Sequence, residues 1–188
     1  MPTLNRTTKH AADALLLIDF MNLFDFKGAR ALAPRAIRAA RATASLKARA
    51  NQREVPCIFV NDNFGAWTRS FEQLVQTCIG RGGASETIAH LLEPTAADIS
   101  ILKPRHSAFY GTPLEFLLDE LEVTRLVIAG IAADNCVFAT AQDAHVRKFK
   151  VWIPSNCVAA ESPANEQSVL RQMARTLKGE THRYEEPK

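Results

Sequence analysis

The sequence lacks the patterns that would place this chain in a membrane or around a structural metal. The apolar run 14–18 ends at Asp19, far short of the roughly 20 residues that a membrane span requires. The cysteines, Cys57, Cys78, Cys136 and Cys157, form no C-x-x-C pair, so a zinc knuckle and a dithiol redox motif are both absent. We therefore expect a cytoplasmic protein without a membrane partner.

Charge of one sign is also scarce. The chain has 23 Lys and Arg against 20 Asp and Glu, a net charge of +3, and its basic residues are spread along the sequence. This argues against nucleic acid as a partner. With 188 residues, 47% of them hydrophobic, the chain fits one domain over 1–188.

Short apolar runs alternate with helical patterns. The runs are apolar at every position, which is typical of strands buried on both faces of a parallel sheet; they are 14–18, 55–60, 99–102, 126–129 and 151–153. Helices are expected from Pro34, from Pro113 with Thr112 as cap, over 134–146 and over 163–177. The alternation predicts a three-layer α/β fold. The segment 61–94 breaks the rhythm, with helical patches at 71–78 and from Ser85 and a Gly-rich loop at 80–83, and we expect it to extend over the active face.

Three reactive side chains stand where predicted strands end. Asp19 follows the first run, Lys103 follows the run 99–102, and Cys136 lies just beyond the run 126–129, where a helix begins. In parallel sheets ligands bind outside the carboxyl ends of the strands. We therefore expect a carboxylate, an ammonium and a thiol to converge there.

Three segments carry a resemblance to a known family. They are 15–22 (LLLIDFMN), 103–109 (KPRHSAF) and 130–137 (GIAADNCV), the last followed by 139–144 (ATAQDA). Together they resemble the isochorismatase-like cysteine hydrolases, which include nicotinamidases and N-carbamoylsarcosine amidohydrolases. The resemblance implies a six-stranded parallel sheet flanked by helices, with Asp19, Lys103 and Cys136 at the positions of the catalytic triad. It also implies an oxyanion hole from the backbone amides of Ala132 and Cys136, after a cis peptide between Ile131 and Ala132.

The chemistry of these groups suits acyl transfer. A thiol needs activation before it attacks a carbonyl at neutral pH, and we expect Lys103 and a helix N-terminus to favour the thiolate of Cys136. Asp19 can take the thiol proton and return it to the departing amine. Cys57, Cys78 and Cys157 are expected to be structural.

The substrate-binding residues are harder to predict. Phe64 stands where nicotinamidases, by the resemblance, carry the first metal-binding His, and the sequence has no His between His10 and His90; we therefore expect no metal and no cofactor. The aromatic residues Phe20, Trp67 and Phe109 are candidates for the pocket wall. Arg81 or Arg105 could hold a carboxylate, which would suit a carboxylate-bearing amide or a ureido acid, whereas His106 is expected to be a solvated or hydrogen-bonded loop residue.

These residues predict a hydrolase that cleaves a small amide or carbamoyl compound through a thioester. Two alternatives stay open: a vinyl ether hydrolase of the isochorismatase type, and a non-catalytic redox or binding module that uses Cys136. For either enzyme we expect a small-molecule substrate and a homo-oligomer.

Overall fold

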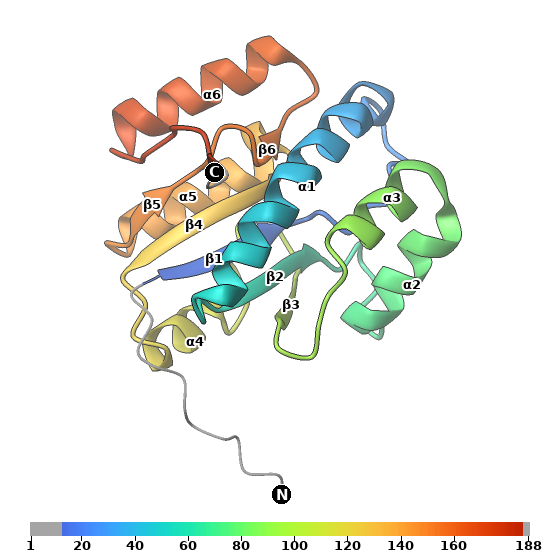
Figure 1. The fold of residues 1–188 in the computed structure, drawn as a ribbon, viewed down its shortest axis with the longest axis horizontal. Helices are drawn as coiled ribbons and strands as arrows, with labels where there is room; N and C mark the ends of the chain where they lie inside the picture. Colours follow the sequence, from blue (N-terminus) through green and yellow to red (C-terminus); the bar gives the residue numbers. More distant parts are fainter. Residues whose placement is uncertain (1–12, 186–188) are drawn as a thin grey trace, which may run out of the picture.

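Six parallel strands form the centre of the computed structural model, which describes residues 13–185 (Figure 1). They are β1 (Asp13–Ile18), β2 (Cys57–Asp62), β3 (Ile99–Lys103), β4 (Arg125–Ile131), β5 (Lys150–Trp152) and β6 (Val158–Ala159). The order is β3-β2-β1-β4-β5, and β6 also pairs with β4. This confirms the expected α/β class and the parallel sheet.

Helices cover both faces of the sheet (Figure 1). On one face lie α1 (Ala29–Gln52), α2 (Phe71–Arg81) and α3 (Gly83–Leu91); on the other lie α4 (Leu114–Glu120), α5 (Phe138–Val146) and α6 (Pro163–Thr176). Strand β1 is apolar at successive positions because both of its faces are buried. Leu16 and Ile18 belong to the core on the α4–α6 face, whereas Leu15 and Leu17 belong to the core on the α1–α3 face.

Several boundaries differ from those predicted. Helix α1 begins at Ala29, so the expectation that Pro34 opens it was wrong; Gly28 precedes the helix with a φ of +97°. The expected Gly-rich loop at 80–83 shrinks to Gly82 between α2 and α3. The predicted strand 55–60 is shifted by two residues, to Cys57–Asp62. None of the helices in the described part of the chain is long and apolar enough to cross a membrane.

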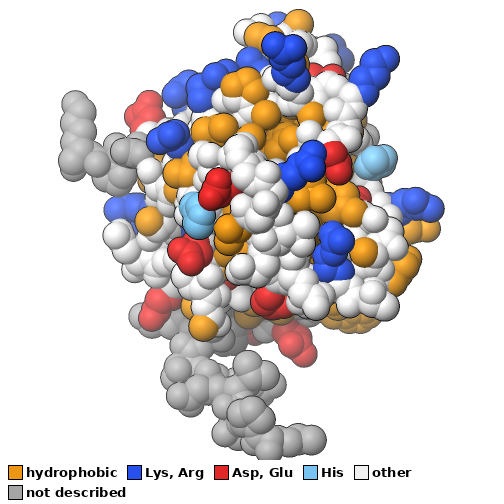
Figure 2. All heavy atoms as spheres, turned by 90° about the vertical axis from the view of Figure 1, so that its right-hand side faces the viewer, with side chains coloured by type: hydrophobic (Ala, Val, Ile, Leu, Met, Phe, Trp, Pro, Cys, Tyr) orange, Lys and Arg blue, Asp and Glu red, His pale blue; other side chains and the backbone are white. Residues whose placement is uncertain are grey.

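Figure 2 shows the side of the molecule that carries α2 and α3. On this face Lys and Arg side chains are interspersed with Asp and Glu around apolar side chains.

Candidate active site

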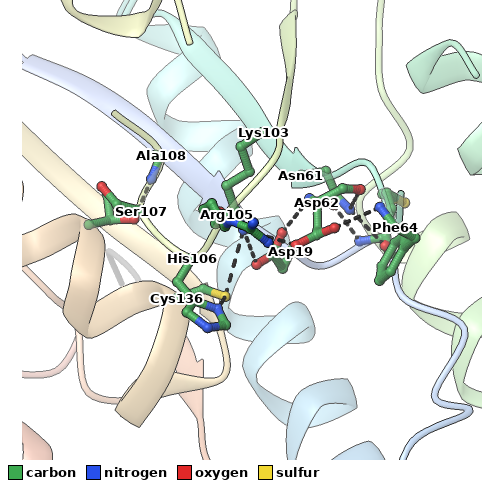
Figure 3. A network of polar contacts seen from close by, with 12 residues as sticks. Asp19, Asn61, Asp62, Phe64, Lys103, Arg105, His106, Ser107, Ala108 and Cys136 are labelled. Carbon is green, nitrogen blue, oxygen red and sulfur yellow. Dashed lines mark hydrogen bonds and ion pairs between the residues drawn. The ribbon is translucent and has the colours of Figure 1, made fainter. Parts of the chain in front are cut away.

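The carboxyl ends of four neighbouring strands bring the predicted reactive side chains together (Figure 3). Asp19 follows β1, Asp62 and Lys103 end β2 and β3, and Cys136 lies in the short π-helix η1 (Ala133–Val137) after β4. The Nζ atom of Lys103 lies 2.7 Å from Oδ2 of Asp19 and 3.6 Å from Sγ of Cys136. A thiol, a carboxylate and an ammonium thus share one cluster.

Burial and charge determine the protonation states in this cluster. Burial raises the pKa of the Asp19 carboxyl more than Lys103 and the hydrogen bonds lower it, which makes Asp19 a stronger base than an ordinary carboxylate. Burial lowers the pKa of Lys103, but the charges of Asp19 and Asp62 and the hydrogen bond to Asp19 raise it by more, so Lys103 is held protonated.

The expectation of a stabilised thiolate was wrong for the substrate-free site. Burial raises the pKa of the Cys136 thiol, and the Asp19 carboxylate raises it further, which outweighs the opposite effect of Lys103. The resting cysteine is therefore a thiol.

The backbone around the nucleophile has an unusual geometry. The peptide between Ile131 and Ala132 is cis, as the resemblance implied. Gly130 has a φ of +153°, and a Cβ atom there would lie 2.4 Å from the carbonyl oxygen of Ile18. Only glycine fits where β4 passes the end of β1 so closely. Asp19, the next residue after Ile18, itself adopts a φ of +52°.

Side chains outside the triad hold its loops in place (Figure 3). The buried amide of Asn61 donates to the carbonyl of Met21 and accepts from the Met21 backbone N–H, at 2.9 and 3.0 Å. The N–H of Asp62 donates to Oδ1 of Asp19 at 2.6 Å. These contacts fix the loop after β1 to the end of β2, and so orient the Asp19 carboxylate.

The segment after Lys103 is anchored on α5. The hydroxyl of Ser107 donates to the Asp143 carboxylate, and the N–H of Ala108 donates to Oγ1 of Thr140 at 3.0 Å. These contacts join the segments 103–109 and 139–144. They also place Nδ1 of His106 3.7 Å from the Cys136 sulfur, a proximity that sequence reasoning missed.

A pocket of about 270 Å³ opens beside the triad. The residues of its lining come mostly from loops at the strand ends; they are Asp19, Asn22, Phe26, Leu32, Asp62, Phe64, His106, Ile131, Ala132, Asn135, Cys136 and Glu161. Cys136 and Ala132, the predicted donors of the oxyanion hole, therefore both border the space that a substrate would occupy. Of the segment 61–94, only Asp62 and Phe64 reach this pocket; α2 and α3 pack on the α1 side of the sheet instead.

The three aromatic residues expected to bind the substrate lie elsewhere. Phe20 is fully buried in the core under α1, and Phe109 is buried against Phe149. Trp67 is 78% exposed and is not part of the pocket lining. The aromatic wall is formed by Phe26 and Phe64 instead. No periodicity in the sequence identifies Phe26 and Phe64 as pocket residues, because their positions depend on loop conformation.

The other three cysteines have buried side chains. Cys57, Cys78 and Cys157 are buried free thiols, and burial raises the pKa of Cys78 to about 11 and those of Cys57 and Cys157 to about 12. In the described residues, no group of three His, Cys, Asp or Glu side chains is placed to hold a metal ion.

Comparison with known proteins gives consistent matches. The profile of the isochorismatase domain matches residues 13–182. An uncharacterized isochorismatase family protein of Bacillus subtilis is 37% identical over 167 residues, which cover 89% of this chain and 91% of that protein. The maleamate amidohydrolase of Pseudomonas putida is 29% identical over 153 residues, which cover 77% of this chain and 71% of that enzyme.

Solved structures share the fold. The nicotinamidase of Staphylococcus aureus superposes with a TM-score of 0.70 at 22% identity, covering 93% of this chain and 99% of that one. The N-carbamoylsarcosine amidase of Thermoplasma acidophilum gives 0.70 at 23% identity, covering 92% and 96%. At these identities the superpositions concern the fold.

Proposed function

Because the chain belongs to the isochorismatase domain family, we propose that it hydrolyses a C–N bond of a small non-peptide amide or carbamoyl compound through a thioester on Cys136. The observation that carries the proposal is the placement of the Cys136 thiol. It lies 3.6 Å from the Lys103 ammonium, which is itself paired with Asp19, at the edge of a pocket. The similarity to a maleamate amidohydrolase supports the reaction class.

The first half of the reaction forms the thioester. Asp19 accepts the thiol proton while Sγ of Cys136 bonds to the carbonyl carbon, and the carbonyl oxygen becomes an oxyanion. The backbone N–H groups of Ala132 and Cys136 stabilise that oxyanion. The C–N bond then breaks, and Asp19 passes its proton to the departing amine.

The second half releases the acid. Asp19, again a carboxylate, takes a proton from water as the water oxygen attacks the thioester carbon. The C–S bond breaks, and the sulfur regains its proton from Asp19. Lys103 stays protonated throughout, because its contacts with Asp19 and Asp62 oppose proton loss. Its roles are to position Asp19 and to stabilise negative charge on the sulfur.

A panel of small primary amides and N-carbamoyl compounds tests the proposal, with ammonia release as the readout. We expect turnover by the wild-type protein and a loss of at least about a thousandfold in Cys136→Ala. Cys78→Ala is the matched control, since its thiol is buried away from the pocket, and it should retain activity. Cleavage of isochorismate at a rate unaffected by Cys136→Ala would contradict the proposal and favour the vinyl ether reaction.

A further inference from the structure

The pocket beside Cys136 is acidic, although the chain as a whole has a net charge of +3. Its lining contains the carboxylates of Asp19, Asp62 and Glu161 and, among the described residues, no Arg or Lys side chain. Lys103 lies behind Asp19 with no exposed side-chain surface, and its charge is paired there. The charge that a bound molecule faces is therefore negative.

We propose, resting on the proposed amidase function, that this pocket selects amides whose non-reacting end carries a positive charge and disfavours those that end in a carboxylate. A like charge close to Asp62 and Glu161 is repelled, whereas an ammonium is attracted and can donate to their oxygens. The apolar side chains of Leu32, Phe26 and Phe64 complete the lining. They can contact the short carbon chain that joins the two ends of such a substrate.

The Glu161 carboxylate lies against the start of α1. It occupies the space beside Gly28, where a Cβ atom would lie 2.3 Å from Oε1. The positive end of the α1 dipole favours a negative charge there, and the first turn of α1 has no acidic residue of its own. Among the described residues no basic side chain forms an ion pair with Glu161, so its charge is free to act on a ligand.

Asp62 supplies the second charge. Its Oδ1 accepts the Phe64 N–H at 2.6 Å, and its Oδ2 lies 3.9 Å from the Lys103 ammonium, a longer approach than the 2.7 Å between Lys103 and Asp19. Lys103 therefore compensates Asp19 more than Asp62. The side chain of Asp62 is 29% exposed and borders the pocket.

The arginines that could have held a carboxylate lie elsewhere. Arg81 ends α2 and is absent from the pocket lining. The carbonyl of Arg105 accepts a hydrogen bond from Lys103 at 3.1 Å, but its side chain is likewise absent from the lining. Arg35 is paired with Glu166 at 2.7 Å. The expectation of an anionic substrate held by Arg81 or Arg105 is therefore not supported.

Charged thiol reagents test the pocket without requiring amide turnover. The probes are methanethiosulfonates that carry a 2-aminoethyl (cationic), methyl (neutral) or 2-sulfonatoethyl (anionic) group; Cys136 forms a mixed disulfide with each and releases methanesulfinate. Peptide mass mapping measures the rate at which Cys136 itself is modified. Each of these rates is divided by the rate at which the same reagent reacts with 2-mercaptoethanol. We expect the cationic reagent to exceed the anionic one by about tenfold. An anionic reagent that reacts as fast or faster would overturn the proposal.

Matched variants assign the effect to the pocket. Glu161→Gln should lower the ratio of cationic to anionic rates by about threefold or more. Glu120→Gln removes the same charge from an exposed position of α4 outside the pocket, and it should leave the ratio unchanged. An equal effect of both variants would mean that overall charge, and not Glu161, sets the ratio, which would overturn the assignment.

Substrates then extend the test to catalysis. Of 4-aminobutanamide, 4-hydroxybutanamide and succinamate, which share a four-carbon chain, the aminated amide should show the highest kcat/KM and succinamate the lowest. Fastest hydrolysis of succinamate would overturn the selectivity. If none of the amides in this series or the earlier panel is hydrolysed while the reagent order holds, the proposed amidase function fails and the charge preference of the pocket stands.

Discussion

Lys103→Met removes the cation from the centre of the candidate site and should cost stability as well as activity. The Lys103 side chain has no exposed surface, and its ammonium lies 2.7 Å from an Asp19 carboxylate that is itself 6% exposed. At that distance two unit charges attract by about 6 kcal/mol for an effective dielectric constant of about 20. Met avoids the desolvation of a buried ammonium, so the expected net loss is about 3–5 kcal/mol in the free energy of unfolding at pH 8.

The loss should depend on pH in a defined direction. In Lys103→Met the Asp19 carboxyl stays buried without its main partner, so its pKa lies still further above the unfolded value of 3.8 than in the wild type. A raised pKa stabilises the folded state at low pH, and this stability is lost as the pH rises through the folded value. The difference between variant and wild type should therefore be smaller at pH 5 than at pH 8.

Urea unfolding at both pH values measures these differences. The double variant Asp19→Asn/Lys103→Met removes both charges and should be more stable at pH 8 than Lys103→Met alone, because no uncompensated charge remains buried. The reasoning would be refuted if the single variant lay within about 1 kcal/mol of the wild type at pH 8, or if the double variant were no more stable than the single one.

Three further outcomes are expected. Gly130→Ala should destabilise the fold by about 2 kcal/mol or more, because the new methyl group would meet the Ile18 carbonyl oxygen at 2.4 Å; unfolding within about 0.5 kcal/mol of wild type would contradict this. The free energy of unfolding should fall as the pH rises above 9, because the unfolded chain releases thiol protons that the folded chain keeps. Cys78→Ala should reduce the slope of this fall by about 1.4 kcal/mol per pH unit, up to the raised Cys78 pKa of about 11. An unchanged slope in urea titrations would refute the assignment. Amide hydrolysis should survive dialysis against a chelator, because the described residues offer no three-ligand metal site; one equivalent of tightly bound metal in elemental analysis, with activity lost on its removal, would contradict this.

The reactive cluster could be predicted from the sequence because parallel strands constrain it. Asp19 and Lys103 follow short runs that are mostly apolar, and such strands end at the same edge of the sheet. The same rule applied to β2 would have found Asp62, but the run Asn61 to Asn63 reads as a turn. Asn61 instead lies within β2, and its side chain orients the loop after β1.

Features that depend on tertiary contacts could not be predicted. Helix α1 starts at Ala29 rather than Pro34, after a Gly28 whose missing side chain makes room for Glu161, a residue more than a hundred positions away. The pKa of Cys136 follows from burial next to Asp19, which outweighs the nearby ammonium. Phe26 and Phe64 line the pocket through loop conformation, whereas the better sequence candidate, Trp67, points into solvent.

The most direct test of the account is to trap the covalent intermediate on Cys136. The protein would be mixed with an amide that it hydrolyses, quenched in acid within one turnover, and examined by intact mass spectrometry and peptide mapping. The account predicts a mass increase equal to the acyl group, located on Cys136 and absent from Cys136→Ala, which should also be inactive. Turnover without any adduct, at a rate that Cys136→Ala leaves unchanged, would contradict it.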